Sequence, residues 1–255
     1  MSRSFRSHRT EAVILRRSEY GEADRILTLL TPHMGKIRAL AKGVRKPASR
    51  KAGHLELYTR ADLLLADGRE MRLITQAVSL DAYRPLREDL YRASCAGYAV
   101  ELLDKFTLDE EENRALFDLL TDTLTRLGES PDPGLVLRYY ELRLLDLMGY
   151  RPELLRCVRR GETIQAEDQF FSAADGGAVC ADCGPQTPGA LPISLAALKL
   201  LRHLQRSEYA EIASLSVRLA VHAEAEAVLL RYLTYLLERQ LKSVEFLRLV
   251  RREDG

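Results

Sequence analysis

The chain has 255 residues, of which 46% are hydrophobic and 29% charged, as in an ordinary globular protein with one large domain or two to three smaller ones. No stretch approaches about 18 uncharged apolar residues, which argues against a transmembrane helix, and no apolar run follows the basic residues 1–10, so we expect a disordered basic arm there rather than a secretory signal. The four widely spaced cysteines do not form a disulfide scaffold pattern, which favours a reducing, cytoplasmic compartment.

The net charge of +1 conceals a strong asymmetry along the chain. Residues 1–80 contain 16 Lys and Arg against 8 Asp and Glu, whereas residues 81–255 contain 22 basic and 29 acidic side chains. A basic segment of this kind indicates a polyanionic partner. We therefore expect a polyanionic partner for the first part and a different role for the second, because an acidic surface does not hold phosphates.

Five strands are predicted in the first 80 residues from runs of apolar and alternating side chains. Asp67-Gly68 separates two of these runs and is a strong hairpin signal. Five short strands in about seventy residues fit a small barrel better than an open sheet, because closure removes exposed edges. The predicted strands are residues 11–19, 25–31, 36–42, 55–66 and 69–78.

Helices are predicted after a boundary at residues 81–85, because apolar residues now recur at helical spacing. Asp132 is expected to cap the third helix, with Pro133 at its first position, and Ser194 is expected to cap the fourth. Gly128 and Gly149 are expected just past the ends of the second and third helices. The predicted helices are residues 86–106, 111–127, 133–148, 195–204 and 216–241.

A Gly- and Pro-rich segment, residues 149–192, interrupts the helices and contains three of the four cysteines. The fourth, Cys95, falls on the apolar face of a predicted helix and is expected in the core. The fold class is therefore α+β and multidomain: a five-stranded barrel followed by a helical domain with an inserted cysteine segment. The four predicted parts are residues 1–80, 81–149, 150–192 and 193–255.

A run of seven cations within sixteen residues is the first candidate site, and no acidic residue interrupts it. The first three can share one face of a strand while Ile37 turns to the core, and the loop of residues 43–53 adds four more. Cations placed on phosphates release counterions, so the run suits a nucleic-acid backbone; a solvated face without a partner is the alternative. The predicted DNA-binding residues are Lys36, Arg38, Lys42, Arg45, Lys46, Arg50 and Lys51.

The cysteine segment is the second candidate site. Cys180 and Cys183 form a C-x-x-C pair, and Cys157 lies 23 positions earlier. A structural zinc site normally has four ligands, but Arg160 stands where the partner of Cys157 is expected. We expect Cys157, Cys180 and Cys183 to bind zinc, with a water, a displaced side chain or a neighbouring carboxylate as the fourth ligand. A degenerate, metal-free knuckle is the alternative.

No motif in the chain assembles a catalytic site. The sequence has no Gly-rich phosphate loop, no H-E-x-x-H and no G-x-S-x-G. A catalytic zinc is disfavoured because no His or Glu base adjoins the cysteines, and a redox pair is disfavoured because no βαβ context surrounds them. We therefore expect a protein that is not an enzyme; a zinc hydrolase or redox protein using the cysteine segment is the competing interpretation.

Seven segments match one known family in order and spacing, and together they span about residues 10–200. They are residues 12–15, 20–26, 31–38, 41–47 with its continuation 49–50, 55–57, 147–157 and 176–183. On these segments the chain resembles the bacterial RecO family of recombination mediators. The chain departs from the family pattern at Arg160, and its connection of residues 43–54 is too short and too Gly/Pro-broken for the helix that many OB-folds carry there.

The resemblance implies an N-terminal OB-fold and a helical domain with an inserted zinc knuckle. It implies binding of single- and double-stranded DNA, annealing of complementary strands, and loading of RecA onto strands coated by single-strand-binding protein (SSB). RecR, and often RecF and the SSB C-terminal tail, would be partners, without a membrane or a small-molecule substrate, in the bacterial cytoplasm at the nucleoid. The alternative function is an OB-fold RNA-binding or ribosome-associated protein.

Overall fold

The computed structural model describes residues 7–253, and the side chains of residues 7–250. The chain forms two compact units. The first consists of the residues up to Glu129 together with those from Phe246 onward, and the second is Ser130–Glu245. The expected disordered arm is wrong for residues 7–10, which belong to the first strand, and residues 1–6 lie outside the described part. Among the described residues, no helix is both long and apolar enough to cross a membrane.

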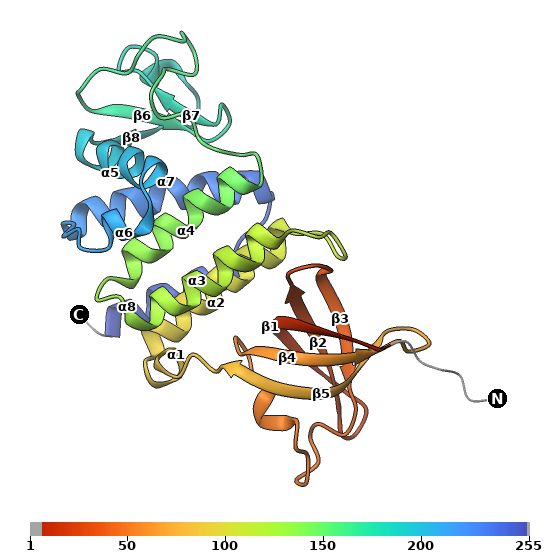
Figure 1. Cartoon of the computed structure of the whole chain (residues 1–255). Helices are drawn as coiled ribbons and strands as arrows, with labels where there is room; N and C mark the ends of the chain where they lie inside the picture. The colour runs from red at the N-terminus through yellow and green to blue at the C-terminus, as the bar shows by residue number, and fades with distance from the viewer. Residues whose placement is uncertain (1–6, 254–255) are drawn as a thin grey trace. The chain divides into compact units, whose positions relative to one another are not determined.

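The first unit contains a closed five-stranded barrel in the order β1-β2-β3-β5-β4, which confirms the predicted barrel (Figure 1). β3 and β5 pair in parallel at Ala39↔Arg72 and Leu40↔Leu73, and the other neighbours are antiparallel. A five-stranded Greek-key barrel of this kind is an OB-fold. The strands are β1 (Ser7–Tyr20), β2 (Asp24–Thr31), β3 (Gly35–Ala41), β4 (Arg60–Ala66) and β5 (Arg72–Asp81).

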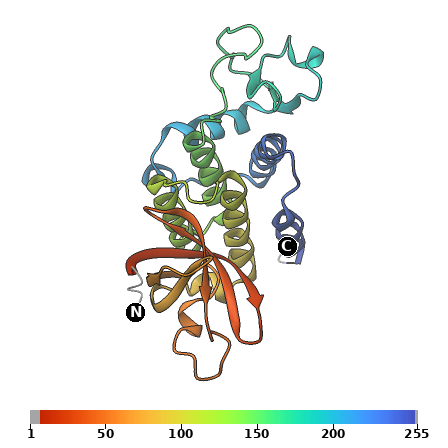
Figure 2. The ribbon, with the colours of Figure 1, turned by 90° about the vertical axis from the view of Figure 1, so that its right-hand side faces the viewer.

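Alternating side chains fill the barrel interior, as the period of a strand requires. On β3, Ile37, Ala39 and Ala41 belong to the core, which turns Arg38 outward. The connection from β3 to β4 carries only a single 3-10 turn, η1 (Ala52–His54), and it projects from the barrel in both views (Figures 1 and 2). This agrees with the prediction that the connection lacks the helix that many OB-folds carry there.

The fourth strand begins at Arg60 rather than at the predicted residue 55. Leu55 packs in the barrel core although it does not belong to a strand, so the apolar residue that suggested a strand there has a packing role instead. Tyr58 has a φ of 65° and donates its backbone N–H to the Ile14 carbonyl at 2.9 Å. A left-handed residue cannot continue an extended strand, and the chain therefore enters β4 only after this turn.

Three helices complete the first unit up to Glu129. The predicted helix of residues 86–106 is two helices, because Asp89 is extended and its side chain accepts the Arg92 N–H as a cap. Gly128 was expected beyond the second helix, but it lies inside α3, where a Cβ would be 3.5 Å from the Pro85 side chain. Cys95 is fully buried on α2, as predicted. The helices are α1 (Pro85–Glu88), α2 (Leu90–Phe106) and α3 (Arg114–Glu129).

The second unit is helical, and its predicted caps are confirmed. Asp132 accepts the Leu135 N–H with Pro133 in the first turn, Gly149 follows the helix at a φ of 78°, and Ser194 accepts the Ala197 N–H. The single helix predicted for residues 216–241 is wrong, because Glu238 takes a φ of 51° and ends α7. The helices are α4 (Pro133–Leu147), α5 (Leu195–Arg206), α6 (Tyr209–Ile212) and α7 (Leu219–Leu237), with α8 (Lys242–Glu253) continuing into the first unit.

A small three-stranded antiparallel sheet lies between α4 and α5, in the order β7-β6-β8. No strands were predicted in this Gly- and Pro-rich segment, and strands of three or four residues are too short to show an alternating pattern. The strands are short, and the 3-10 turn η2 (Gly184–Gln186) follows the cysteine pair. The strands are β6 (Gln169–Ser172), β7 (Gly177–Val179) and β8 (Leu191–Ile193).

Candidate functional site

Five of the seven predicted DNA-binding cations are exposed, and they lie on β3 and on the loop that follows it. The loop is held at its base by two hydrogen bonds: Gly43 donates its N–H to Asp24 Oδ1 at 2.7 Å, and Arg45 donates its N–H to the Ala23 carbonyl at 2.9 Å. Val44 between them is buried in the barrel core. The buried Val44 fixes the base of the loop, while the charged side chains next to it in sequence point to solvent. The exposed cations are Arg38, Lys42, Arg45, Lys46 and Arg50.

Two of the loop cations also have partners within the barrel. The Arg45 guanidinium lies 3.3 Å from Glu19, and that carboxylate is largely exposed. Lys51 is half-buried and donates Nζ to the Ile74 carbonyl at 2.9 Å. Burial lowers the pKa of Lys51 below its ordinary value, while the charge of Asp24 acts in the opposite direction. Lys51 is therefore a weaker candidate for phosphate contact than the exposed cations.

Lys36 does not share the exposure expected from its position two residues before Arg38. Only 8% of its surface is exposed, and Nζ donates to the Asp104 carbonyl, Asp104 Oδ1 and the Thr107 carbonyl at 2.8–3.1 Å. Asp104 itself is buried at the end of α2. The side chain of Lys36 therefore binds the end of α2 to the barrel. This role has no local signal in the sequence, because the partners are about 70 residues away.

Arg72 was not among the DNA-binding residues predicted from the sequence. It lies at the start of β5, opposite Ala39 in the parallel pair, and it lines a hollow together with Arg38. A parallel pairing between β3 and β5 follows from the barrel topology and has no local sequence signal. The cationic surface of the barrel thus extends from β3 onto β5.

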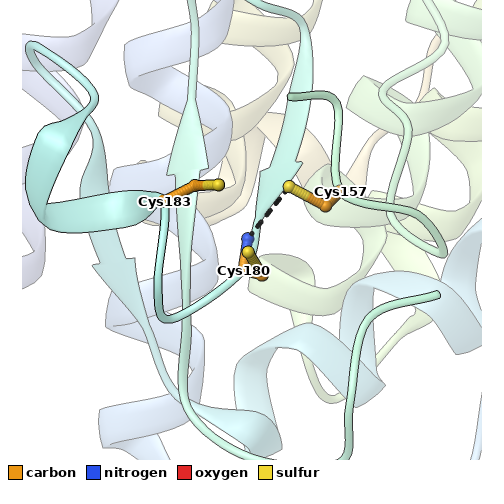
Figure 3. Close-up of side chains that lie close together, drawn as sticks. All are labelled: Cys157, Cys180 and Cys183. Atoms are coloured by element: carbon orange, nitrogen blue, oxygen red, sulfur yellow. Dashed lines mark hydrogen bonds between the residues drawn. The ribbon is translucent and has the colours of Figure 1, made fainter. Parts of the chain in front are cut away.

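The three cysteines of the second unit converge, as predicted (Figure 3). Their Sγ atoms all lie within 4.8 Å of one another, although Cys157 follows α4 and the other two come after β7. Cys180 donates its backbone N–H to the Cys157 sulfur at 3.4 Å, and the Val158 N–H donates to the Ala178 carbonyl at 2.9 Å. The backbone of the two segments therefore holds the thiols together.

The thiols have unequal proton affinities. Burial alone would raise the pKa of Cys157, but backbone N–H donors from Cys180, Arg160 and Arg159 lower it to about 7. The hydrogen bond with Cys180, together with burial and the neighbouring thiolate charge, raises the pKa of Cys183 to about 11. Cys157 thus has more thiolate character near neutral pH than Cys183, and thiolates are the form that binds metals.

The donor set fits a metal that prefers sulfur ligands. Tetrahedral zinc with Zn–S bonds of about 2.3 Å needs sulfurs about 3.8 Å apart, which is compatible with the 4.8 Å limit on the three Sγ atoms. Arg160 occupies the position expected for a fourth cysteine, and its guanidinium pairs with Asp182 at 3.0 Å. Three protein ligands could therefore hold an ion here, and Arg160 places a positive charge where the fourth ligand was expected.

Comparisons with known proteins assign the chain to one family over nearly its whole length. The family model described as "Recombination protein O N terminal" matches residues 1–83, and the one described as "Recombination protein O C terminal" matches residues 87–245. The two matches together cover the barrel, the helices α2–α7 and the cysteine segment.

Curated relatives agree with this assignment, and each is called DNA repair protein RecO. The one from Roseiflexus sp. (strain RS-1) is 46% identical over 242 residues, which is 95% of this chain and 85% of that protein. The relative from Dehalococcoides mccartyi (strain ATCC BAA-2100) is 36% identical over 96% of this chain and 97% of its own length. The relative from Bacillus pumilus (strain SAFR-032) is 34% identical over 94% and 93%. The chain therefore belongs to the RecO family of DNA repair and recombination proteins.

Proposed function

We propose that this protein binds single- and double-stranded DNA through the barrel and anneals complementary strands without catalysing a reaction. The observation that carries the proposal is the group of exposed cations from Arg38 to Arg50, with no acidic residue between them in sequence. Membership of a DNA repair family supports DNA as the polyanion. The competing RNA-binding or ribosome-associated function has no specific observation in its favour.

The proposed mechanism is electrostatic. Two complementary strands repel each other through their phosphates, and cations on both strands' phosphates reduce that repulsion and release counterions. The described barrel, residues 7–81, contains only two aromatic side chains: Tyr20 is half exposed, and Tyr58 is half-buried. Base stacking therefore contributes little, and the protein follows the backbone of either strand with little sequence preference.

We propose that the protein acts as a recombination mediator together with RecR, loading RecA onto SSB-coated single strands at the nucleoid in the cytoplasm. RecF and the SSB C-terminal tail are further proposed partners. In this proposal residues 1–80 bind DNA, residues 81–149 and 193–255 contact proteins, and residues 150–192 form the metal-binding insertion. The acidic balance of residues 81–255 supports protein contacts rather than phosphate contacts for that part.

We propose that zinc binds Cys157, Cys180 and Cys183 and has a structural role. When bound, the metal supplies a cross-link between the segment after α4 and the segment after β7. The chain's own backbone already joins these segments at Cys180 and Ala178, so the metal would add stability to an arrangement that hydrogen bonds define.

The test is a titration of the full chain with labelled single-stranded DNA at several salt concentrations, with annealing of complementary strands followed in the same samples. We expect steeply salt-dependent binding and annealing that needs no ATP. Reversing the charges of Arg38, Lys42 and Arg45 should weaken binding and reduce the salt slope by about 0.7 per lost contact on single strands. Unchanged binding and slope would contradict the proposal, and a clear preference for RNA of equal length would favour the competing function.

A further inference from the structure

A hollow of about 290 Å³ lies on the first unit where β3 and β5 diverge from their short parallel pairing. Its wall carries three cations and three carboxylates, and no single charge dominates it. Arg38 is exposed, and among the described residues the structure records no ion pair for it. The lining residues are Lys36, Ile37, Arg38, Glu70, Met71, Arg72, Asp109 and Glu110.

Two of the three carboxylates of the hollow come from the linker between α2 and α3, which lies against the edge of β3 (Figure 1), and the third, Glu70, precedes β5. Glu110 donates its backbone N–H to the Lys36 carbonyl at 2.8 Å, and Lys36 Nζ lies 3.5 Å from Asp109. The linker backbone passes so close to Gly35 that a Cβ there would be 2.0 Å from the Glu111 carbonyl oxygen. The linker is therefore held against the strand by its backbone.

The ion pairs of the hollow differ in how easily they can be exchanged. Lys36 and Asp104 are both buried, with side chains 9% and 8% exposed, so separating them would leave a buried charge. The Arg72 guanidinium lies 2.8 Å from Glu110; the Arg72 side chain is 30% exposed and the Glu110 side chain 66%. This pair is more open to water than Lys36–Asp104, so separating its partners costs less. Arg72 can thus change partners while the linker backbone stays in place.

We propose that the hollow is a phosphate site, in which a backbone phosphate of the bound strand takes Arg72 from Glu110 and binds Arg72 together with Arg38. The inference rests on the proposed DNA binding and adds Arg72 to the cations that make it. Arg72 donates Nη1 to Glu110 Oε1, and a guanidinium can donate to a phosphate oxygen in the same way, so the exchange replaces one anionic acceptor by another.

The exchange makes Glu110 a built-in competitor of DNA. Every strand that enters the hollow must displace this carboxylate from Arg72, and the nearby negative charge opposes the incoming phosphate. Removing the charge of Glu110 should therefore tighten DNA binding, although no new contact to DNA is added. Removing Arg72 should weaken binding and eliminate one counterion-releasing contact.

The experiment compares Arg72→Gln and Glu110→Gln with wild type in single-stranded DNA titrations of the full chain at several salt concentrations. The matched control is Glu88→Gln, which removes one exposed carboxylate of the same unit that has no recorded ion pair among the described residues. At an ionic strength near 0.1 M, charges farther than about 10 Å from the strand are largely screened. Thermal unfolding of each variant separates changes in binding from loss of fold.

We expect Glu110→Gln to bind about twofold to fivefold more tightly than wild type, as an exposed ion pair is worth up to about that factor. Arg72→Gln should bind more weakly, with a salt slope smaller by about 0.7. If Arg72→Gln matches the control while reversal of the β3 and loop charges weakens binding, the phosphate site is refuted and the proposed function stands. If Arg72→Gln weakens binding but Glu110→Gln matches the control, the exchange is refuted. If wild type binds no DNA, both proposals fail.

Discussion

Lys36→Ala should destabilise the fold and leave DNA binding nearly unchanged, in contrast to the expectation drawn from the sequence. The Lys36 ammonium is enclosed by Asp104 and by two backbone carbonyls. Replacing it by a methyl group leaves the buried Asp104 carboxylate without its main partner. Arg16 remains near, with Nε 3.4 Å from the other carboxylate oxygen, but its own side chain is 60% exposed.

The magnitude follows from these contacts. Removing one partner of a buried ion pair costs about 3–5 kcal/mol of unfolding free energy, because the other charge stays buried. Arg16 compensates part of that loss, so we expect about 2–4 kcal/mol for Lys36→Ala. In the double variant with Asp104→Asn the buried charge is gone, and the two substitutions should couple by about 1–3 kcal/mol. Arg38→Ala, an exposed substitution, should change stability by about 0.5 kcal/mol or less.

Chemical unfolding of wild type, Lys36→Ala, Asp104→Asn, the double variant and Arg38→Ala measures these free energies. DNA titrations at a temperature where all five proteins are folded measure binding. Lys36→Ala should bind with nearly the affinity and salt slope of wild type, and Arg38→Ala should lose about 0.7 of the slope. The reasoning is refuted if Lys36→Ala unfolds like wild type and binds DNA with a reduced slope. In that case Lys36 would contact phosphate rather than hold α2 against the barrel.

Three further predictions concern other parts of the chain. Metal analysis should find about one zinc per chain, and Cys180→Ser should abolish zinc binding and lower the thermal midpoint. Arg160→Cys should tighten zinc binding by on the order of tenfold or more. An Arg160→Cys variant with the zinc affinity of wild type would contradict the assigned geometry. Burial alone would raise the pKa of Asp132, but hydrogen bonds from His222 and from backbone N–H groups lower it overall. The ionised carboxylate therefore stabilises the fold fully at pH values above the unfolded pKa of about 3.9. This stabilisation is lost as the pH falls through the lower pKa of the folded state. Asp132→Asn, which keeps the cap, should therefore lose about 0.5–1 kcal/mol near neutral pH and converge with wild type in acid, as measured by unfolding from pH 3 to 7. Gly35→Ala should destabilise the fold by more than about 1 kcal/mol, because Gly35 has a φ of 60° and its Cβ would overlap the linker backbone; an unchanged midpoint would show that the linker can move away.

Elements with local signals were predictable from the amino-acid sequence. The barrel strands follow from alternating side chains, and Asp132 and Ser194 were identified as caps because a short polar side chain before a helix satisfies its free N–H groups. The thiol cluster was also predictable, since a C-x-x-C pair with a third cysteine in the same Gly- and Pro-rich segment is typical of a metal site. The turn at Tyr58 and the break at Glu238 were missed, because left-handed backbone at a residue other than Gly, Asn or Asp has no strong sequence signal.

The exposure of each cation depends on contacts between residues that are distant in sequence. Lys36 and Arg38 have the same residue class and the same strand parity, and nothing in their neighbourhood in sequence distinguishes them. Asp104 binds the first, while the second stays in solvent. Arg72 joins the cationic surface because closure of the barrel places β5 beside β3 in parallel, far from it along the chain. Burial and ion pairing depend on residues distant in sequence, so a run of charges predicts a candidate surface but not which of its members a partner can contact.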